Sequence, residues 1–165
     1  MKLKIFRVIT ALALILWMAF IFMLSHQTAA QSGAVSGGFT EKLFSVFYPY
    51  FKSMTDMQKQ EIINGASFLI RKAAHFSIYA LLGVFSFLTF YSYSKIKKTA
   101  RLVISFFICF IFAMSDEWHQ TFIVGRSGEI RDVLIDSSGA LIAIIILFLL
   151  LKFTKLGKLK NYIVG

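Results

Sequence analysis

The sequence predicts an all-α integral membrane protein, with four transmembrane helices bundled into a single domain over residues 1–165. Hydrophobic residues make up 58% of the chain and charged residues only 16%, whereas a soluble domain normally carries about 25% charged residues. The mean hydropathy is +0.73. Apolar runs over residues 5–24, 73–91, 102–123 and 133–151 each approach the roughly 20 residues that a helix needs to cross a bilayer.

The first apolar run, residues 5–24, is predicted to remain as a membrane span. A cleaved signal peptide is the alternative, because basic residues precede the run and small residues follow it at Thr28 to Ala30. The apolar stretch is longer than the about 7–15 residues of a signal peptide. We therefore expect a retained span.

The connection over residues 25–66 is predicted to contain an outer, interfacial segment. Residues 31–38 are rich in Gly and Ser, which is typical of a flexible stretch. Large apolar residues then recur at helical spacing at Phe39, Leu43, Phe44, Phe47, Phe51 and Met54. This pattern, interrupted by Pro49, indicates a helix lying on the membrane surface, with a lid over a site as the alternative. Residues 56–70 predict another helix that continues into the second run.

The distribution of basic residues predicts the orientation. Lys and Arg, without Asp or Glu, occupy the segments before the first run, between the second and third, and after the fourth. The positive-inside rule then places both termini and residues 95–101 in the cytoplasm, with residues 25–72 and 116–132 facing outward. The net charge of +10 is thereby explained by topology, and no nucleic-acid partner is expected.

The single cysteine limits the kinds of covalent and metal site that the chain can form, and the single proline limits where a helix can be kinked. Cys109 stands alone, which excludes an intrachain disulfide and a cysteine-rich metal site. Pro49 lies outside all four runs, so no span is predicted to carry a proline kink.

Ionisable residues gather at the predicted outer ends of the runs, above all in residues 115–136. Charges at membrane depth are costly unless they are paired, hydrated or used, so such a cluster is a candidate functional site. The candidates for acid or base catalysis are His75, Asp116, Glu117, His119 and Asp132. The candidates for binding a substrate or an anion are Lys72, Tyr79, Gln120, Arg126, Asp136 and Gln27, with Arg131 in addition.

Helical spacing places several of these candidates on shared faces. Lys72, His75 and Tyr79 follow one another at intervals of three and four residues. A second face carries Asp116, His119 and Gln120, with Glu117 to one side. Asp132 and Asp136 are one turn apart, and Gly139 and Ala143 continue their face. Small residues there would let a neighbouring helix approach closely.

The loop Gly125-Arg126-Ser127-Gly128 could bring an arginine fork and backbone N–H groups to a phosphate or a carboxylate. The oxygen and imidazole groups nearby could also hold a divalent metal ion. The sequence has no HExxH motif and no cysteine pair, and the spacing of Asp116 and His119 is not diagnostic of a metal site. The cofactor is therefore left open.

Each group also has a purely structural explanation. Lys72 could reach to the membrane interface, and His75 could make a hydrogen bond between helices. Asp132 and Asp136 could stabilise the N-terminal end of the fourth helix. Arg126 could pair with an acidic residue of the third run and hold the loop closed.

Two spaced motifs carry a family resemblance. The first is Lys72-x-x-His75-Phe76-x-x-Tyr79-x-x-Leu82-Gly83, and the second runs from Ser115-Asp116-Glu117-x-His119-Gln120 through Gly125-Arg126 to Asp132, Asp136 and Gly139. Together with Ser25-x-Gln27 they resemble the VanZ-like family of bacterial membrane proteins, over nearly the whole chain. Asp136 is often asparagine in that family and His26 is outside its pattern, so no family role is carried over to these two residues.

The resemblance implies a small multi-pass protein of the bacterial inner membrane. The founding member of the family is associated with resistance to teicoplanin, an acylated glycopeptide that acts on cell-wall precursors at the outer leaflet. We therefore expect an outward site, in contact with membrane lipids, that binds or processes an anionic envelope lipid, a lipid-linked precursor or a lipoglycopeptide. A membrane-embedded lipid hydrolase or transferase is one alternative. A non-catalytic ion network or a transporter component is another. The oligomeric state is left open.

Overall fold

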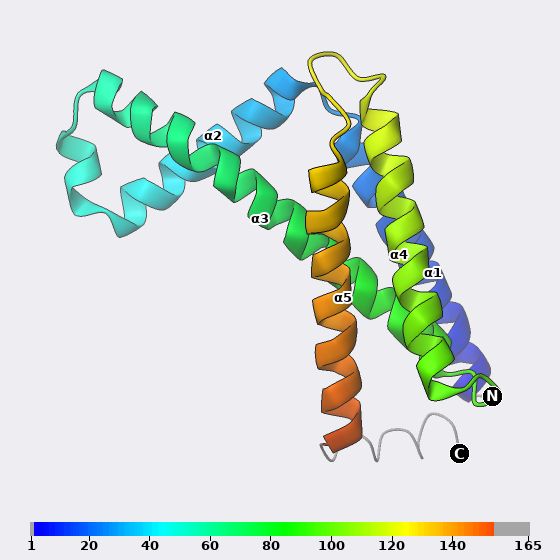
Figure 1. Ribbon diagram of the computed structural model, residues 1–165. Coiled ribbons are helices and arrows are strands. Elements are labelled where there is room, and N and C mark those ends of the chain that lie inside the picture. The colour runs from blue at the N-terminus through cyan, green and yellow to red at the C-terminus, as the bar shows by residue number, and fades with distance from the viewer. Residues whose placement is uncertain (1, 154–165) are drawn as a thin grey trace.

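The computed structural model describes residues 2–153, which form helices joined by short connections (Figure 1). The elements are α1 (Lys2–Ser25), α2 (Ala29–Phe47), the 3-10 helix η1 (Pro49–Ser53), α3 (Asp56–Tyr91), α4 (Lys98–Gln120) and α5 (Ile130–Phe153). α1, α3, α4 and α5 are long and apolar enough to cross a membrane. The prediction of an all-helical chain with four membrane-length apolar helices is confirmed. The basic residues predicted to follow the last span lie mostly outside the described residues.

The four long helices alternate in direction, with α1 and α4 running one way and α3 and α5 the other (Figure 1). α4 ends at Gln120, three residues before the predicted end of the third run. The chain tightens there, because the backbone N–H groups of residues 121–123 each bond to the carbonyl group three residues earlier. This tightening starts the turn that leads to α5.

α3 packs most extensively against α5, and the two backbones come into direct contact. A Cβ atom added to Gly83 would lie 2.6 Å from the carbonyl oxygen of Ala140. A Cβ atom on Gly139 would overlap the backbone of Phe76. The predicted close approach at Gly139 is confirmed, although its small neighbour in the contact is Ala140 rather than Ala143. This crossing sets which α3 side chains meet which α5 side chains.

α2, η1 and the first half of α3 form an arm that projects from the long helices (Figure 1). Ser32, Ser36 and Thr40 are buried at four-residue spacing, and Gly37 lies beside Ile63 of α3. The prediction that residues 31–38 are a flexible stretch is therefore wrong. The small residues form a helical face that lets α2 lie against α3, as in other closely packed helix pairs.

Capping residues and Pro49 set the ends of the arm's helices. Thr28 and Thr55 each form a capping box, with Gln31 and Gln58 respectively, at the starts of α2 and α3. α2 ends at Phe47 and η1 begins at Pro49, as the interrupted pattern predicted. The predicted helix over residues 56–70 is also confirmed, since it forms the first half of α3.

Candidate functional site

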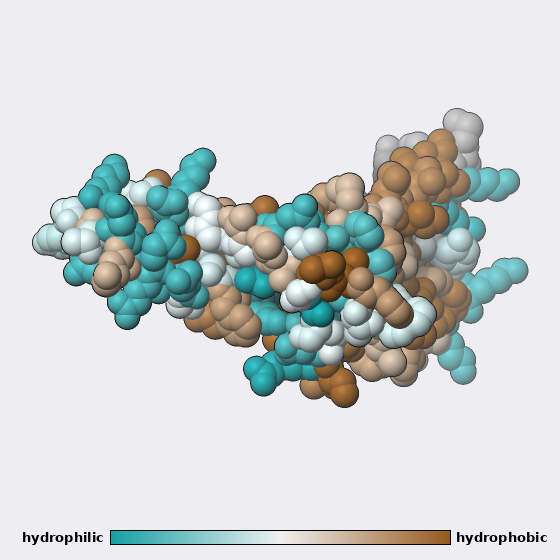
Figure 2. Space-filling model, turned by 90° about the horizontal axis from the view of Figure 1, so that it is seen from above, coloured by the Kyte–Doolittle hydropathy of each residue, from teal (hydrophilic) through white to brown (hydrophobic). Residues whose placement is uncertain are grey.

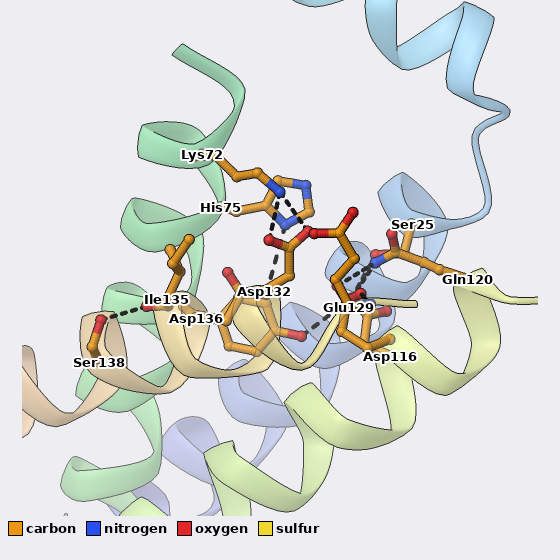
Figure 3. A network of polar contacts seen from close by, with 12 residues as sticks. Ser25, Lys72, His75, Asp116, Gln120, Glu129, Asp132, Ile135, Asp136 and Ser138 are labelled. Carbon is orange, nitrogen blue, oxygen red and sulfur yellow. Dashed lines mark hydrogen bonds and ion pairs between the residues drawn. The ribbon is translucent and has the colours of Figure 1, made fainter. Parts of the chain in front are cut away.

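Polar side chains from four helices converge where α4 ends and α5 begins (Figure 3). α3 supplies Lys72 and His75, and α5 supplies Asp132 and Asp136. α4 contributes its last turns, and α1 contributes its C-terminal residue, Ser25. The contact between α3 and α5 brings their polar turns level with each other.

Lys72 and Asp132 form an ion pair. The Nζ atom of Lys72 donates to both carboxylate oxygens of Asp132, and the two side chains are only 20% and 19% exposed. The ammonium group also lies 5.2 Å from the ring centroid of Phe68. Lys72, predicted to bind an anion, and Asp132, predicted as a base, thus neutralise each other.

Asp116 joins three helices through one carboxylate oxygen. Its Oδ2 atom accepts hydrogen bonds from Ser25 Oγ at 2.7 Å, from the Tyr79 hydroxyl at 3.2 Å and from Gln120 Nε2 at 3.3 Å. The side chain is fully buried. Tyr79 and Gln120, predicted as substrate-binding residues, therefore act here as supports for Asp116.

Glu117 and Gln120 connect the end of α4 to the following loop. Gln120 donates to Glu117 Oε1 at 3.0 Å and accepts from Arg126 Nη1 at 2.8 Å. The other oxygen of Glu117 accepts from the backbone N–H of Glu129 at 3.1 Å, just before α5 begins. Within residues 2–153, Arg126 reaches the acidic residues of α4 through Gln120 and not by a direct ion pair.

The glycines of the α4–α5 loop hold it close to its neighbours. Gly125 has a φ of 76°, a conformation that favours glycine. The adjacent Val124 carbonyl group accepts a hydrogen bond from the N–H of Ala29 at 3.2 Å. A Cβ atom on Gly128 would lie 2.6 Å from the carbonyl oxygen of Glu117. The loop that carries Arg126 is thus tied to both α2 and α4.

His75 faces a buried carboxylate. Its Nδ1 atom lies 3.7 Å from Asp136 Oδ2, which is close enough for an ion pair when the imidazole is protonated but too long for a hydrogen bond. The His75 side chain is 27% exposed, whereas that of Asp136 is 1% exposed. The carboxylate partner of His75 is therefore Asp136, which was predicted as a binding residue and not as an acid or base.

His119 lies apart from the carboxylates. Its Nε2 atom is 3.3 Å from His26 Nδ1, and the ring of Phe22 stacks on it with 4.3 Å between centroids. The predicted face of α4 is divided, because Asp116 and Gln120 point into the bundle while His119 contacts α1. Gln27 is half-buried just after α1, and in the described chain its side chain makes no hydrogen bond.

Arg71 is a site residue that the sequence-based selection missed. Its Nε atom is buried and has no hydrogen-bond partner in the part of the chain that the structure describes. Burial lowers the pKa of Arg126, and the positive charge of Arg71 lowers this pKa further, whereas the charges of Asp116 and Glu117 raise it. Neither arginine makes an ion pair within residues 2–153. The sequence did hold a signal for Arg71 as a site residue, because Arg71 directly precedes Lys72 at the predicted start of a span.

The two remaining expectations concern Arg131 and a metal ion. Arg131 is exposed, and it makes no ion pair within residues 2–153. Among residues 2–153, no three His, Cys, Asp or Glu side chains are placed to hold a metal ion together. Asp132 is instead paired with Lys72, and Asp116 and Glu117 accept hydrogen bonds from donors of the chain.

Comparison with known proteins identifies the family. The family model described as VanZ/LLP1 matches residues 10–151, which include most of α1 and α5 and everything between them. No curated protein matches the chain, and no solved structure does. The matched region contains both motifs that carry the resemblance in the sequence. The chain therefore belongs to the VanZ/LLP1 family.

Proposed function

We propose that this end of the helices faces outward from the bacterial inner membrane and binds the anionic group of an envelope lipid, a lipid-linked cell-wall precursor or a lipoglycopeptide. The observation that carries the proposal is the pair Arg71 and Arg126: the positive charge of Arg71 acts on Arg126, and neither guanidinium group makes an ion pair within residues 2–153. Like charges at a partly buried site repel each other unless an anion joins them. Guanidinium forks suit phosphate and carboxylate groups.

The charge distribution supports the outward orientation. The connection between α3 and α4 contains Lys95 and Lys97 and no acidic residue, which is typical of a cytoplasmic loop. Arg126 lies just beyond the other end of α4, and Arg71 lies near the middle of α3, at the end of the half that belongs to the arm. If each long helix crosses the membrane once, this end faces outward, where lipid-linked precursors and glycopeptides meet.

The arm supports contact with lipid. Seen from above, hydrophilic residues cover the part of the arm farthest from the long helices (Figure 2). The arm also exposes large apolar side chains, among them Phe39, Phe47 and Tyr50. A segment with a polar upper face and exposed aromatic residues is suited to lie at the membrane surface. We place it there, beside the site, with the lid as the alternative role.

Binding of an anionic phospholipid by the purified protein tests the proposal. We expect native mass spectrometry to show retained phosphatidylglycerol on the wild type and much less phosphatidylcholine, which has no net charge. Arg71→Ala and Arg126→Ala should each weaken phosphatidylglycerol binding by about tenfold or more, because a hydrogen bond to a charged group contributes roughly 1.5–3 kcal/mol.

Arg131→Ala is the matched control, because Arg131 is exposed at the same end of the protein. We expect it to bind as the wild type does, and all three variants to keep the wild-type melting temperature within a few degrees. Equal binding by wild type, Arg71→Ala and Arg126→Ala would contradict the proposal. A wild type that retains no anionic lipid would favour the purely structural ion network.

A lipid hydrolase or transferase is a second candidate because His75 is partly exposed beside the buried carboxylate of Asp136. A carboxylate in this position can orient a histidine that acts as general base. Two serines of residues 115–136 that could serve as nucleophiles are engaged elsewhere: Ser115 donates to the Phe112 carbonyl group, and Ser127 donates to Glu129. The structure thus favours an activated water over a serine nucleophile.

Turnover of a bound lipid tests this second candidate. We expect His75→Ala to lower the release of product from the bound lipid by at least about 100-fold, the contribution typical of a general base, while lipid binding persists. His26→Ala should keep full turnover, since His26 contacts His119 and no carboxylate in the described chain. Product formation can be followed by mass spectrometry, and a wild type that binds lipid without turnover would end the enzymatic alternative.

A further inference from the structure

We infer that the bound headgroup carries hydrogen-bond donors, hydroxyl or ammonium, beside its anionic group, and that Asp116 and Asp136 accept them. This inference rests on the proposed anion site at Arg71 and Arg126. It divides the site into two parts, with guanidinium groups for the anion and carboxylates for the donors. The headgroup class is therefore an anionic or zwitterionic lipid that bears hydroxyl or ammonium groups.

Three carboxylate oxygens at the site lack a hydrogen bond. Asp136 is 0% exposed, and neither of its oxygens has a hydrogen-bond partner in the described chain. Asp116 is 1% exposed, and its Oδ1 atom has none either. Buried acceptors are nearly always bonded in native proteins, and an unsatisfied charged acceptor is especially unfavourable. A ligand that brings donors would satisfy these atoms.

The two carboxylates contact successive turns of α3. His75 lies 3.7 Å from Asp136, and Tyr79, one turn further along α3, donates to Asp116 at 3.2 Å. In Figure 3 Asp136 lies near His75, and Asp116 projects from α4 toward the same group of polar side chains. One headgroup could therefore reach both carboxylates.

Four donors of the chain near these carboxylates are already engaged. Lys72 donates to both oxygens of Asp132. Ser25, Tyr79 and Gln120 all donate to the Oδ2 atom of Asp116 and leave its Oδ1 atom free. His75 is too far from Asp136 for a hydrogen bond. A donor from outside the chain is thus the chemistry that this arrangement recognises.

Partly exposed side chains lie next to the buried carboxylates. His75 is 27% exposed beside Asp136, and Lys72 and Asp132 are about one-fifth exposed one helical turn away on their helices. A headgroup that enters past the imidazole would meet Asp136 first. This position favours a small donor such as a hydroxyl or an ammonium group.

Three lipids that differ in their donors test the inference, and two of them, phosphatidylglycerol and phosphatidylmethanol, have the same charge. Phosphatidylglycerol carries two hydroxyl groups, phosphatidylmethanol has the same charge without them, and phosphatidylethanolamine supplies an ammonium group. We expect the wild type to bind phosphatidylglycerol, phosphatidylethanolamine or both at least about tenfold more tightly than phosphatidylmethanol. Preference for phosphatidylglycerol would identify hydroxyl donors, and preference for phosphatidylethanolamine would identify ammonium.

Two substitutions at Asp136 test whether this residue causes the preference for lipids that carry donors. Asp136→Leu removes both acceptors, and Asp136→Asn keeps the shape but replaces one acceptor by a donor. Each variant should bind the three lipids with nearly equal affinity. The affinity for phosphatidylmethanol should stay as it is in the wild type. Asp56→Asn, at an exposed acid in the arm, should keep the wild-type preference. Melting temperatures will show whether each variant is folded, and Asp136→Asn remains informative if Asp136→Leu does not fold.

The outcomes separate the two proposals. Equal wild-type affinity for the three lipids would overturn the donor inference and leave the anion site standing. A preference that both Asp136 variants retain would overturn it as well. If Arg126→Ala lowers the affinity for all three lipids while the Asp136 variants remove only the preference, both proposals are supported. If the wild type binds none of the lipids, both fail together.

Discussion

Gly83→Ala is expected to destabilise the protein by about 3 kcal/mol or more, the upper end of what overpacking does. The added methyl group would lie 2.6 Å from the carbonyl oxygen and 2.9 Å from the Cα atom of Ala140. Both are backbone atoms, so no side-chain rotation can relieve the overlap, and α3 and α5 must separate. Alanine otherwise favours a helix over glycine by about 1 kcal/mol. The expected loss therefore runs against the intrinsic helix propensity.

Gly65→Ala is a matched control within the same helix. A Cβ atom at Gly65 has nothing within 4 Å, so this substitution should leave stability unchanged or raise it slightly. Thermal unfolding of both variants in detergent measures the difference. We expect the melting temperature of Gly83→Ala to fall by roughly 10 °C or its monodisperse peak to disappear. Equal melting of the two variants would show that the helices do not touch at this point.

The membrane-length helices were predictable from the sequence because length and hydropathy are properties of the chain alone. The start of α3 was also predictable, since Asp56 opens a helical pattern that runs into the second apolar run. Residues 31–38 were misjudged for a physical reason. Glycine and serine are typical of a flexible loop in water, but the same small side chains form a packing face when another helix lies against them.

The site was predictable as a set of residues but not as a set of pairs. Helical spacing placed Lys72 and His75 on one face of α3. It likewise placed Asp132 and Asp136 on one face of α5. Which acid meets which base depends on how α3 crosses α5, and helical spacing within one helix does not define that crossing. Arg71 was passed over for the same reason, because its proximity to Arg126 arises from the path of the α4–α5 loop.

Asp116→Ala is the other substitution with a large expected effect. It removes the common acceptor of Ser25, Tyr79 and Gln120, which belong to three different helices. Each buried donor left without a partner is unfavourable by about 1–3 kcal/mol. The contributions do not add fully, because the side chains can relax together. We expect a total loss of about 3–5 kcal/mol in the free energy of unfolding, measured by thermal or denaturant unfolding.

Two further variants serve as a control and as a test of the cause of this loss of stability. Ser115→Ala changes the preceding residue, whose exposed side chain bonds only to a carbonyl group of its own helix, and it should melt as the wild type does. In a Tyr79→Phe background, Asp116→Ala should be less destabilising, because the hydroxyl group that loses its acceptor is already gone. An equal loss in both backgrounds would mean that the Tyr79 bond contributes nothing to stability. A smaller loss would show that Asp116 stabilises the bundle by satisfying donors from neighbouring helices.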